Sequence, residues 1–311
     1  MNKVTVSICF ITKNEEETLD RCLKSLKGLV DEIIVVDTGS TDKTVKIAKK
    51  YRAKVFQFPW QDDFSLARNF ALSKATKTWT MWLDADDVLS AEHYREIKKY
   101  LSKVNKKTDG IMVPYVLSTN KVGTPERFTN RLRVFRTEKN IRFKYPIHEI
   151  LETKGIQLEY IKSAYVLHAP KAEKNSFQRN ITILLQTIKS KKYAQDFHIL
   201  FHIGKEYQRA GQMLKAINAY KKAFTNAKNT NDRYNSLIRI AQCSISKKKL
   251  ADASNYAHQA LKIDAKRPES LEIIASIKAE MGHIESANFW KSLSEQIPQK
   301  ISNQVMKWSE Y

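Results

Sequence analysis

The chain has 311 residues, of which 42% are apolar and 28% charged, and this composition excludes a wholly disordered protein. Its 8 glycines and 7 prolines are too few for a collagen-like, low-complexity or turn-rich all-β architecture. Lys and Arg number 54 against 33 Asp and Glu, and the resulting net charge of +21 predicts attraction to polyanions, acidic surfaces or phosphorylated ligands.

The basic excess is spread along the chain. Residues 1–170 carry 30 basic and 21 acidic side chains, and residues 171–311 carry 24 and 12. No nucleic-acid-binding motif accompanies the charge, so nucleic acid is not expected as a partner. The first residues run into a strand pattern rather than a signal peptide, and no apolar run approaches the ~18 residues of a membrane span. We therefore expect a soluble, cytoplasmic protein whose membrane contact is at most peripheral.

The first part of the chain alternates short apolar runs with amphipathic segments. The runs VTVSICFI, EIIVVD, AKVFQF and WTMWL predict strands at residues 4–11, 32–37, 53–58 and 79–83. Apolar residues at helical spacing predict helices at residues 19–26, 44–51 and 66–75. This alternation is typical of a parallel α/β sheet with right-handed crossovers. The later segments GIMVPYVL, RLRVFR and AYVLHA predict a β extension within residues 110–170.

The last part of the chain has a helical repeat. Small residues stand at Gly204, Ala241 and Ala275, which are 37 and 34 residues apart, and Gly211 and Gly282 share one turn position. The pattern is similar to the 34-residue tetratricopeptide repeat, in which small residues let two paired helices approach closely. A generic helical bundle is the alternative.

Near residues 170–178 the sequence changes from alternating strand and helix patterns to helical periodicity, and this change predicts two domains. We place an α/β domain at residues 1–172 and a helical domain at residues 173–311, with the repeats at approximately 197–299. Tetratricopeptide stacks form concave surfaces that hold peptides or partner proteins. The basic excess of this region favours an acidic peptide or protein partner. A dimerisation module, which would make the protein a homodimer, is the alternative role.

Polar and acidic clusters follow the predicted strands, at residues 12–17, 37–42, 62–63 and 84–87. In an open parallel sheet, ligands bind beyond the carboxyl ends of the strands. Neither GxGxxG nor GxxxxGK[ST] occurs, so a nucleotide here must hold its phosphates by another route. We expect that route to be a Mg²⁺ or Mn²⁺ ion bridging carboxylates and a diphosphate, because both ions prefer oxygen ligands.

Four motifs carry a resemblance to a known family, in the order ITKNEEETLDRCLKSL, EIIVVDTGSTDKT, DDFSLARNFAL and MWLDADD. In this order and spacing they resemble family 2 glycosyltransferases of the GT-A fold. The later RLRVFR, IHE and VLHAP segments and the helical tail resemble a bacterial subgroup that includes the sublancin-type peptide S-glycosyltransferases. The resemblance implies a Rossmann-like α/β domain that transfers sugars from nucleoside diphosphates, followed by an all-α domain with tetratricopeptide-like repeats.

The resemblance also implies which residues bind the donor. Thr12 and Glu15 would line the nucleotide pocket, and Asp37 would accept a hydrogen bond from the uracil ring of a UDP-sugar. Asp63 and Arg68 would lie beside the base and the diphosphate.

A second implied group surrounds the cation. Asp84 would approach the ribose or the metal, Asp86 would bind the metal directly, and His168 would be a late metal ligand. Each role has a structural alternative: Asp37 caps the following helix, Arg68 forms a surface ion pair, and His168 is a hydrogen-bonded core histidine.

The implied reaction inverts the anomeric centre in a single displacement, which needs a general base on the acceptor side. The candidates for this base are His148, Glu149 and Glu152, and Asp87 is a further candidate. We favour Glu149 because IHEI follows the strand-like IRF and Pro146. A buried structural ion pair is the alternative role for Glu149.

The sequence therefore predicts a metal-dependent hexosyltransferase, with UDP-glucose as the expected donor. The expected acceptor is a peptide side chain, such as a cysteine thiol of a bacteriocin-like peptide. A cell-surface glycan or glycolipid acceptor is the second hypothesis. A non-enzymatic tetratricopeptide scaffold with a dead transferase domain is the third, and the intact DAD sequence, Asp37 and Arg68 argue against it.

Overall fold

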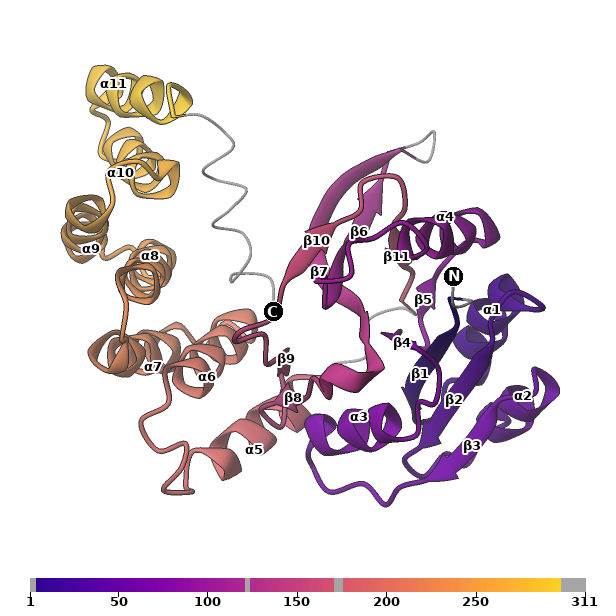
Figure 1. Ribbon diagram of the computed structural model, residues 1–311. Helices are drawn as coiled ribbons and strands as arrows, with labels where there is room; N and C mark the ends of the chain where they lie inside the picture. The colour runs from indigo at the N-terminus through magenta and orange to yellow at the C-terminus, as the bar shows by residue number, and fades with distance from the viewer. Residues whose placement is uncertain (1–3, 121–123, 171–175, 298–311) are drawn as a thin grey trace. The chain divides into compact units, whose positions relative to one another are not determined.

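The computed structural model describes residues 4–120, 124–170 and 176–297 (Figure 1). The chain divides into two compact units, residues 1–174 and residues 175–311. The first unit combines strands and helices, whereas the described part of the second is helical. Within the described ranges, no helix has both the length and the apolar character that a membrane crossing requires.

The strands of the first unit are β1 (Val6–Thr12), β2 (Glu32–Asp37), β3 (Lys54–Gln57), β4 (Trp79–Trp82), β5 (Asp87–Val88), β6 (Gly110–Thr119), β7 (Pro125–Arg136), β8 (Phe143–Lys144), β9 (Ile150–Leu151), β10 (Leu158–Tyr160) and β11 (Val166–His168). The main sheet has the order β3-β2-β1-β4-β7-β6-β11-β5, and β10 also pairs with β6. The first four strands in this order, from β3 to β4, are parallel to one another, and β7 is antiparallel to both β4 and β6. Strands β8 and β9 form a separate antiparallel pair.

The helices of this unit are α1 (Glu16–Leu26), α2 (Thr44–Lys50), α3 (Phe64–Ser73) and α4 (Ala91–Leu101), with a short 3₁₀ helix at Thr137–Lys139. The strands and helices predicted between residues 4 and 83 are confirmed, with shifted ends. Helix α3 begins two residues earlier than predicted because Asp63 caps it: the carboxylate accepts a hydrogen bond from the Leu66 amide at 3.0 Å. Helix α1 begins three residues earlier than predicted, and its first turn carries Glu16 and Glu17, which suit the positive end of a helix dipole.

The sheet register brings the predicted polar clusters to one edge. In the parallel pair β1 and β2, Thr12 lies opposite Asp37, and β4 flanks β1 on its other side. Strand β5 pairs with β11 in the antiparallel sense, so that Asp87 lies opposite His168. The carboxyl edge of the parallel strands is therefore the place where a site can form.

The described helices of the second unit are α5 (Phe177–Thr187), α6 (Phe197–Arg209), α7 (Met213–Asn226), α8 (Thr230–Ser246), α9 (Leu250–Ile263), α10 (Pro268–Glu280) and α11 (Ile284–Glu295) (Figure 1). From α6 onward they form successive helix pairs. The turns inside the pairs place Gly211, Lys248 and Gly282 at φ +72°, +55° and +79°, which is the left-handed region that ends helices. Gly204 lets α6 approach α7, because a Cβ atom there would lie 2.5 Å from the Tyr220 ring.

Candidate active site

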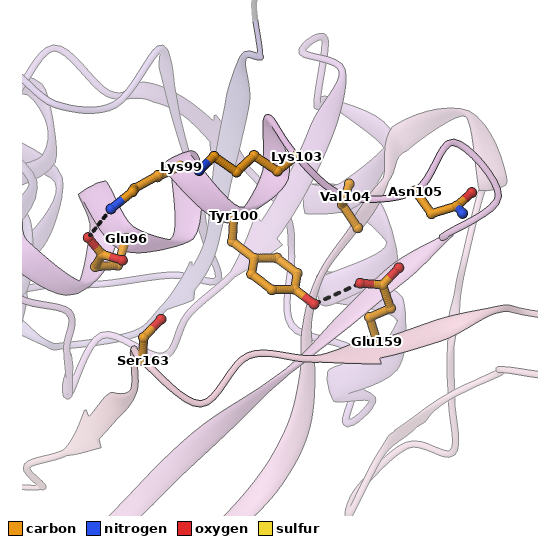
Figure 2. Close-up of a pocket in the computed structure, with 8 residues that line it drawn as sticks. All are labelled: Glu96, Lys99, Tyr100, Lys103, Val104, Asn105, Glu159 and Ser163. Carbon is orange, nitrogen blue, oxygen red and sulfur yellow. Dashed lines mark hydrogen bonds and ion pairs between the residues drawn. The ribbon is translucent and has the colours of Figure 1, made fainter.

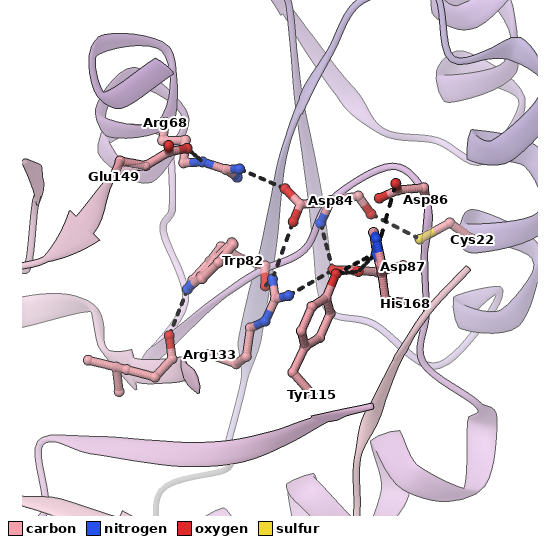
Figure 3. Close-up of polar contacts among 11 residues, drawn as sticks. Cys22, Arg68, Trp82, Asp84, Asp86, Asp87, Tyr115, Arg133, Glu149 and His168 are labelled. Atoms are coloured by element: carbon pink, nitrogen blue, oxygen red, sulfur yellow. Dashed lines mark hydrogen bonds and ion pairs between the residues drawn. The ribbon is translucent and has the colours of Figure 1, made fainter. Parts of the chain in front are cut away.

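The acidic run after β4 forms a tight turn at the carboxyl edge of the sheet (Figure 3). Leu83 and Ala85 are buried, and they hold the turn against the core. The Asp84 amide donates a hydrogen bond to Asp87 Oδ2 at 2.9 Å, which closes the turn. The backbone then enters β5, where the Ala169 amide donates to the Asp86 carbonyl at 3.1 Å. The second of these bonds joins the turn to the residue that follows β11, the strand that carries His168.

The two residues predicted to bind a metal, Asp86 and His168, come together, and Asp87 joins them. One ligand atom from each of the three lies within 4.8 Å of the others. His168 Nδ1 is 3.9 Å from Asp86 Oδ2 and 3.8 Å from Asp87 Oδ1. Carboxylate oxygens and an imidazole nitrogen form a donor set that suits Mn²⁺ or Mg²⁺, so these residues fit the implied cation.

The electrostatics of this group favour a bound cation. Burial and the negative charge of Asp84 raise the pKa of Asp86 to about 6. Burial alone would lower the pKa of His168, but the nearby carboxylates of Asp87 and Asp86 raise it above its ordinary value. A divalent cation between these side chains would relieve the repulsion among the carboxylates and favour their ionised forms.

Arg68 joins two of the predicted site residues that are far apart in sequence. From α3, its Nη2 donates to Asp84 Oδ1 at 2.7 Å, and its Nε donates to Glu149 Oε1 (Figure 3). The Arg68 side chain is only 13% exposed, so this is a partly buried pair and not the surface ion pair considered as its alternative role. Its guanidinium also lies 4.9 Å from the Trp82 ring centroid.

Burial alone would lower the pKa of Arg68, but the charges of Asp84 and Glu149 raise it above its ordinary value. Burial would likewise raise the pKa of Asp84, and the charges of Arg68 and Arg133 hold it below its ordinary value. Both side chains therefore carry their full charge at neutral pH, and each neutralises the other.

Arg133 is a site residue that sequence reasoning missed. It lies on β7, is fully buried, and places Nη2 3.1 Å from Asp87 Oδ2 and Nη1 3.9 Å from Asp84 Oδ2. Its guanidinium stacks 3.8 Å from the Trp82 ring centroid and 4.5 Å from that of Tyr115. The signal was present in RLRVFR, because an arginine inside a buried strand needs a charged partner.

Tyr115 was missed as well. From β6, its hydroxyl donates to Asp87 Oδ1 at 2.8 Å and lies 2.6 Å from His168 Nδ1. No sequence signal distinguished Tyr115 from the other aromatic residues in strand-like segments. Its role follows from the pairing of β6 with β11.

Thr12 and Asp37, predicted for the nucleotide pocket, lie side by side and are buried. Asp37 Oδ2 accepts hydrogen bonds from the amides of Gly39 and Ser40 at 3.2 and 3.0 Å, and Oδ1 accepts one from Thr12 Oγ1 at 3.4 Å. Asp37 therefore holds the turn after β2. It does not cap the following helix α2, whose N-cap residue is Lys43, so the capping alternative is wrong.

The other two predicted donor residues also have local partners. Glu15 Oε2 accepts a hydrogen bond from Thr18 Oγ1 at 2.7 Å at the start of α1. Asp63 serves as the cap of α3 and also accepts from Ser65 Oγ at 2.6 Å. Glu15 and Asp63 therefore each contact the first turn of a helix, α1 and α3 respectively.

A separate hollow of about 460 Å³ lies near the Gly110 end of β6 (Figure 2). Its floor contains a hydrogen bond of 2.7 Å from the Tyr100 hydroxyl to Glu159. The residues that line it are Glu96, Lys99, Tyr100, Lys103, Val104, Asn105, Glu159 and Ser163. None of these is a predicted site residue, so the hollow is distinct from the acidic turn.

Comparisons with known proteins relate the first unit to glycosyltransferases. Residues 7–157 match the sequence profile of glycosyl transferase family 2. The glycosyltransferase SunS, from the SPbeta prophage of Bacillus subtilis, is 27% identical over 277 residues, which cover 84% of this chain and 62% of SunS. A TPR repeat-containing protein of Synechococcus elongatus is 39% identical over 163 residues, covering 50% of this chain and 37% of the relative. The chain thus spans less than two thirds of the length of either relative.

A solved structure shares the fold. TarS residues 1–349 of S. aureus, in complex with UDP-GlcNAc, is 17% identical, with a TM-score of 0.51 over 90% of this chain and 92% of that one. The predicted fold class is confirmed, with a GT-A-type α/β domain followed by a helical region. The matched region, residues 7–157, is therefore a glycosyl transferase family 2 domain.

Proposed function

We propose that the protein transfers a hexose, with glucose as the first candidate, from a UDP-sugar to a peptide side chain. The observation that carries the proposal is the group formed by Asp86, Asp87 and His168 at the carboxyl edge of the sheet, with Arg68 nearby. A donor diphosphate needs positive charge in a chain that has no glycine-rich phosphate loop. The TarS complex with UDP-GlcNAc supports a UDP-sugar as the donor class.

In this proposal Asp86 and His168 hold a Mg²⁺ or Mn²⁺ ion. When bound, the ion would neutralise the charge that develops on the leaving diphosphate. Thr12 and Asp37 contact the nucleoside, with Glu15 and Asp63 shaping its pocket, and Asp84 faces the ribose. The reaction inverts the anomeric carbon in a single displacement, as the resemblance to family 2 glycosyltransferases implies.

Arg68 links donor binding to the general base. In the structure its guanidinium is divided between Asp84 and Glu149. A donor diphosphate that accepts a hydrogen bond from the Arg68 guanidinium would compete with Glu149 for that guanidinium. Glu149 is then released, and its carboxylate can accept the proton of the acceptor nucleophile. This exchange would make the base available only when the donor is bound.

We assign the peptide acceptor on the basis of the similarity to SunS, which extends beyond the family 2 domain. The helical unit would bind the peptide. Its exposed apolar residues Met281, Ile284 and Phe289, which are 49%, 58% and 58% exposed, favour dimerisation as the second role. A glycan or glycolipid acceptor remains the second function, because the net charge of +21 suits an anionic membrane surface.

Calorimetry with UDP tests the donor site. Wild type should bind UDP in the presence of Mg²⁺ or Mn²⁺ and lose most of that affinity in EDTA, and Asp86→Ala should abolish the metal-dependent part. Asp20→Ala, at a surface ion pair outside the site, is the matched control and should bind as wild type does. Tight UDP binding in EDTA that Asp86→Ala leaves unchanged would remove the cation from the mechanism.

A further inference from the structure

We propose that Asp87 is a positioning residue rather than a metal ligand, and that Arg133 and Tyr115 act through it to orient His168. The inference rests on the proposed function, because it concerns the same site. It divides the three candidate ligands into two that face the cation, Asp86 and His168, and one that holds them in place.

The first argument is that the oxygens of Asp87 are already occupied. Oδ2 accepts from the Asp84 amide at 2.9 Å and lies 3.1 Å from Arg133 Nη2, and Oδ1 accepts from the Tyr115 hydroxyl at 2.8 Å. Each carboxylate oxygen therefore already has a hydrogen-bond donor, and Oδ2 also faces the positive charge of Arg133. A metal bond to Asp87 would have to displace one of these partners.

The second argument is exposure. The Asp87 side chain is fully buried, whereas those of Asp86 and His168 are 28% and 31% exposed. An ion and its diphosphate ligand must reach the site from solvent, and they meet Asp86 and His168 first. Asp87 also balances the charge of the fully buried Arg133, and removing either partner would leave an uncompensated buried charge.

The third argument concerns the ring nitrogens of His168. The Tyr115 proton is directed to Asp87 Oδ1, so the Tyr115 oxygen is an acceptor toward His168 Nδ1, 2.6 Å away. This arrangement keeps the hydrogen of neutral His168 on Nδ1, so the ring lone pair that can bind a cation is the one on Nε2. Ligating histidines are commonly fixed in this way by a hydrogen bond from the other ring nitrogen.

The test removes only the Tyr115 hydroxyl, in the full-length chain. Tyr115→Phe should weaken Mn²⁺ binding in the presence of UDP by about 10- to 100-fold, the range found for partners that orient metal ligands. The apparent KM for Mn²⁺ should rise, while kcat at saturating Mn²⁺ stays within a few-fold of wild type. Electron paramagnetic resonance measures the concentration of free Mn²⁺ directly, so this measurement does not depend on the transferase activity. Asp86→Asn, which changes a ligand, should lose transfer at every Mn²⁺ concentration.

Tyr100→Phe is the matched control, because its hydroxyl also donates to a carboxylate but lies in the separate hollow. Suppose that wild type binds Mn²⁺ and that the two variants, Tyr115→Phe and Tyr100→Phe, bind it with equal affinity. The inference is then wrong. Absence of Mn²⁺–UDP binding in wild type would instead refute the proposed function.

A measurement without metal tests the positioning role in either case. In ¹⁵N-histidine-labelled apoprotein at a pH where His168 is neutral, NMR should find the hydrogen on Nδ1 in wild type and a shift toward Nε2 in Tyr115→Phe. A hydrogen on Nε2 in wild type would overturn the inference.

Discussion

From Glu149 through Arg68, Asp84 and Arg133 to Asp87, the side-chain charges at the site alternate in sign over one continuous chain of ion pairs. Buried or partly buried pairs of this kind add little net stability, because each charge gives up its hydration. They do fix geometry, since a displaced member leaves its neighbour unbalanced. We infer that the role of these ion pairs is to orient the acidic turn.

Glu149→Gln tests the proposed base. For a hydroxyl acceptor, the substitution should slow transfer by about 10²-fold or more at every pH, because general-base catalysis contributes that much. For a cysteine acceptor the loss should be modest and should partly recover at pH 8.5, since a thiol of pKa ~8.5 ionises without help. The measurement is a pH–rate profile with Cys- and Ser-containing versions of one peptide.

Full activity of Glu149→Gln on both peptides at every pH would show that the base is another residue, and His148 would be examined next. Glu126→Gln, at an exposed position of β7, is the control substitution. The exchange of Arg68 adds a second expectation. UDP binding should weaken less in Glu149→Gln than in Arg68→Ala, because only Arg68 would contact the diphosphate.

At the scale of elements, the approach of α6 to α7 depends on Gly204. A methyl group there would lie 2.5 Å from the ring of Tyr220, which is fully buried and bonded through its hydroxyl to Gln208. Gly204→Ala should therefore destabilise the protein by about 1–3 kcal/mol through overpacking. This exceeds the ~1 kcal/mol that alanine gains in helix propensity. Denaturant unfolding measures the change.

A double-mutant cycle separates the two effects. In a Tyr220→Leu background, which removes the ring, Gly204→Ala should become neutral or stabilising. A destabilisation of equal size in both backgrounds would show that the close contact with Tyr220 is not the cause.

Glu32 joins the start of β2 to β1 and to the loop before β4. It is buried, accepts hydrogen bonds from Ser7 and Thr76, and pairs with Lys54 at 2.7 Å. Burial alone would raise its pKa, but the pair with Lys54 and the hydrogen bonds from Ser7 and Thr76 lower the pKa to about 2. Because the folded pKa is depressed, the contribution of Glu32 to stability is complete above the unfolded pKa of ~4.3 and is lost as the pH falls toward 2.

Glu32→Gln should consequently lower the free energy of unfolding at pH 7, and the difference from wild type should shrink between about pH 4.5 and pH 2. Urea unfolding at several pH values measures this. A difference that stays constant down to pH 2 would mean that the charge of Glu32 does not contribute.

At the scale of the whole molecule, we propose that the boundary near residue 172 separates donor binding from acceptor recognition. A fragment of residues 1–172 should keep metal-dependent UDP affinity, because Asp86, His168 and Arg68 all lie within it. Transfer to a peptide should fall sharply while hydrolysis of the UDP-sugar continues. Transfer by the fragment at the full-length rate would assign the helical unit to dimerisation, which light scattering of Phe289→Ser would then test.

The sequence determined the local features of this protein. The order of strands and helices from residue 4 to 83 follows from apolar periodicity, which depends only on neighbouring residues. The repeat of small residues at 204, 241 and 275 likewise predicted the helix pairs. The metal-binding roles expected for Asp86 and His168 came from the resemblance of the motifs to family 2 glycosyltransferases.

Only the tertiary structure decided how the charges are paired. Arg68 meets Glu149 across 81 positions of sequence, and the Arg133 guanidinium reaches Asp87 from a strand that the sequence did not place beside β4. A buried charge requires a partner, but hydrophobic pattern and spacing do not say which strand will be its neighbour. Strand pairing makes that choice, and it places Asp87, which the sequence offered only as a further candidate base, at the centre of the site.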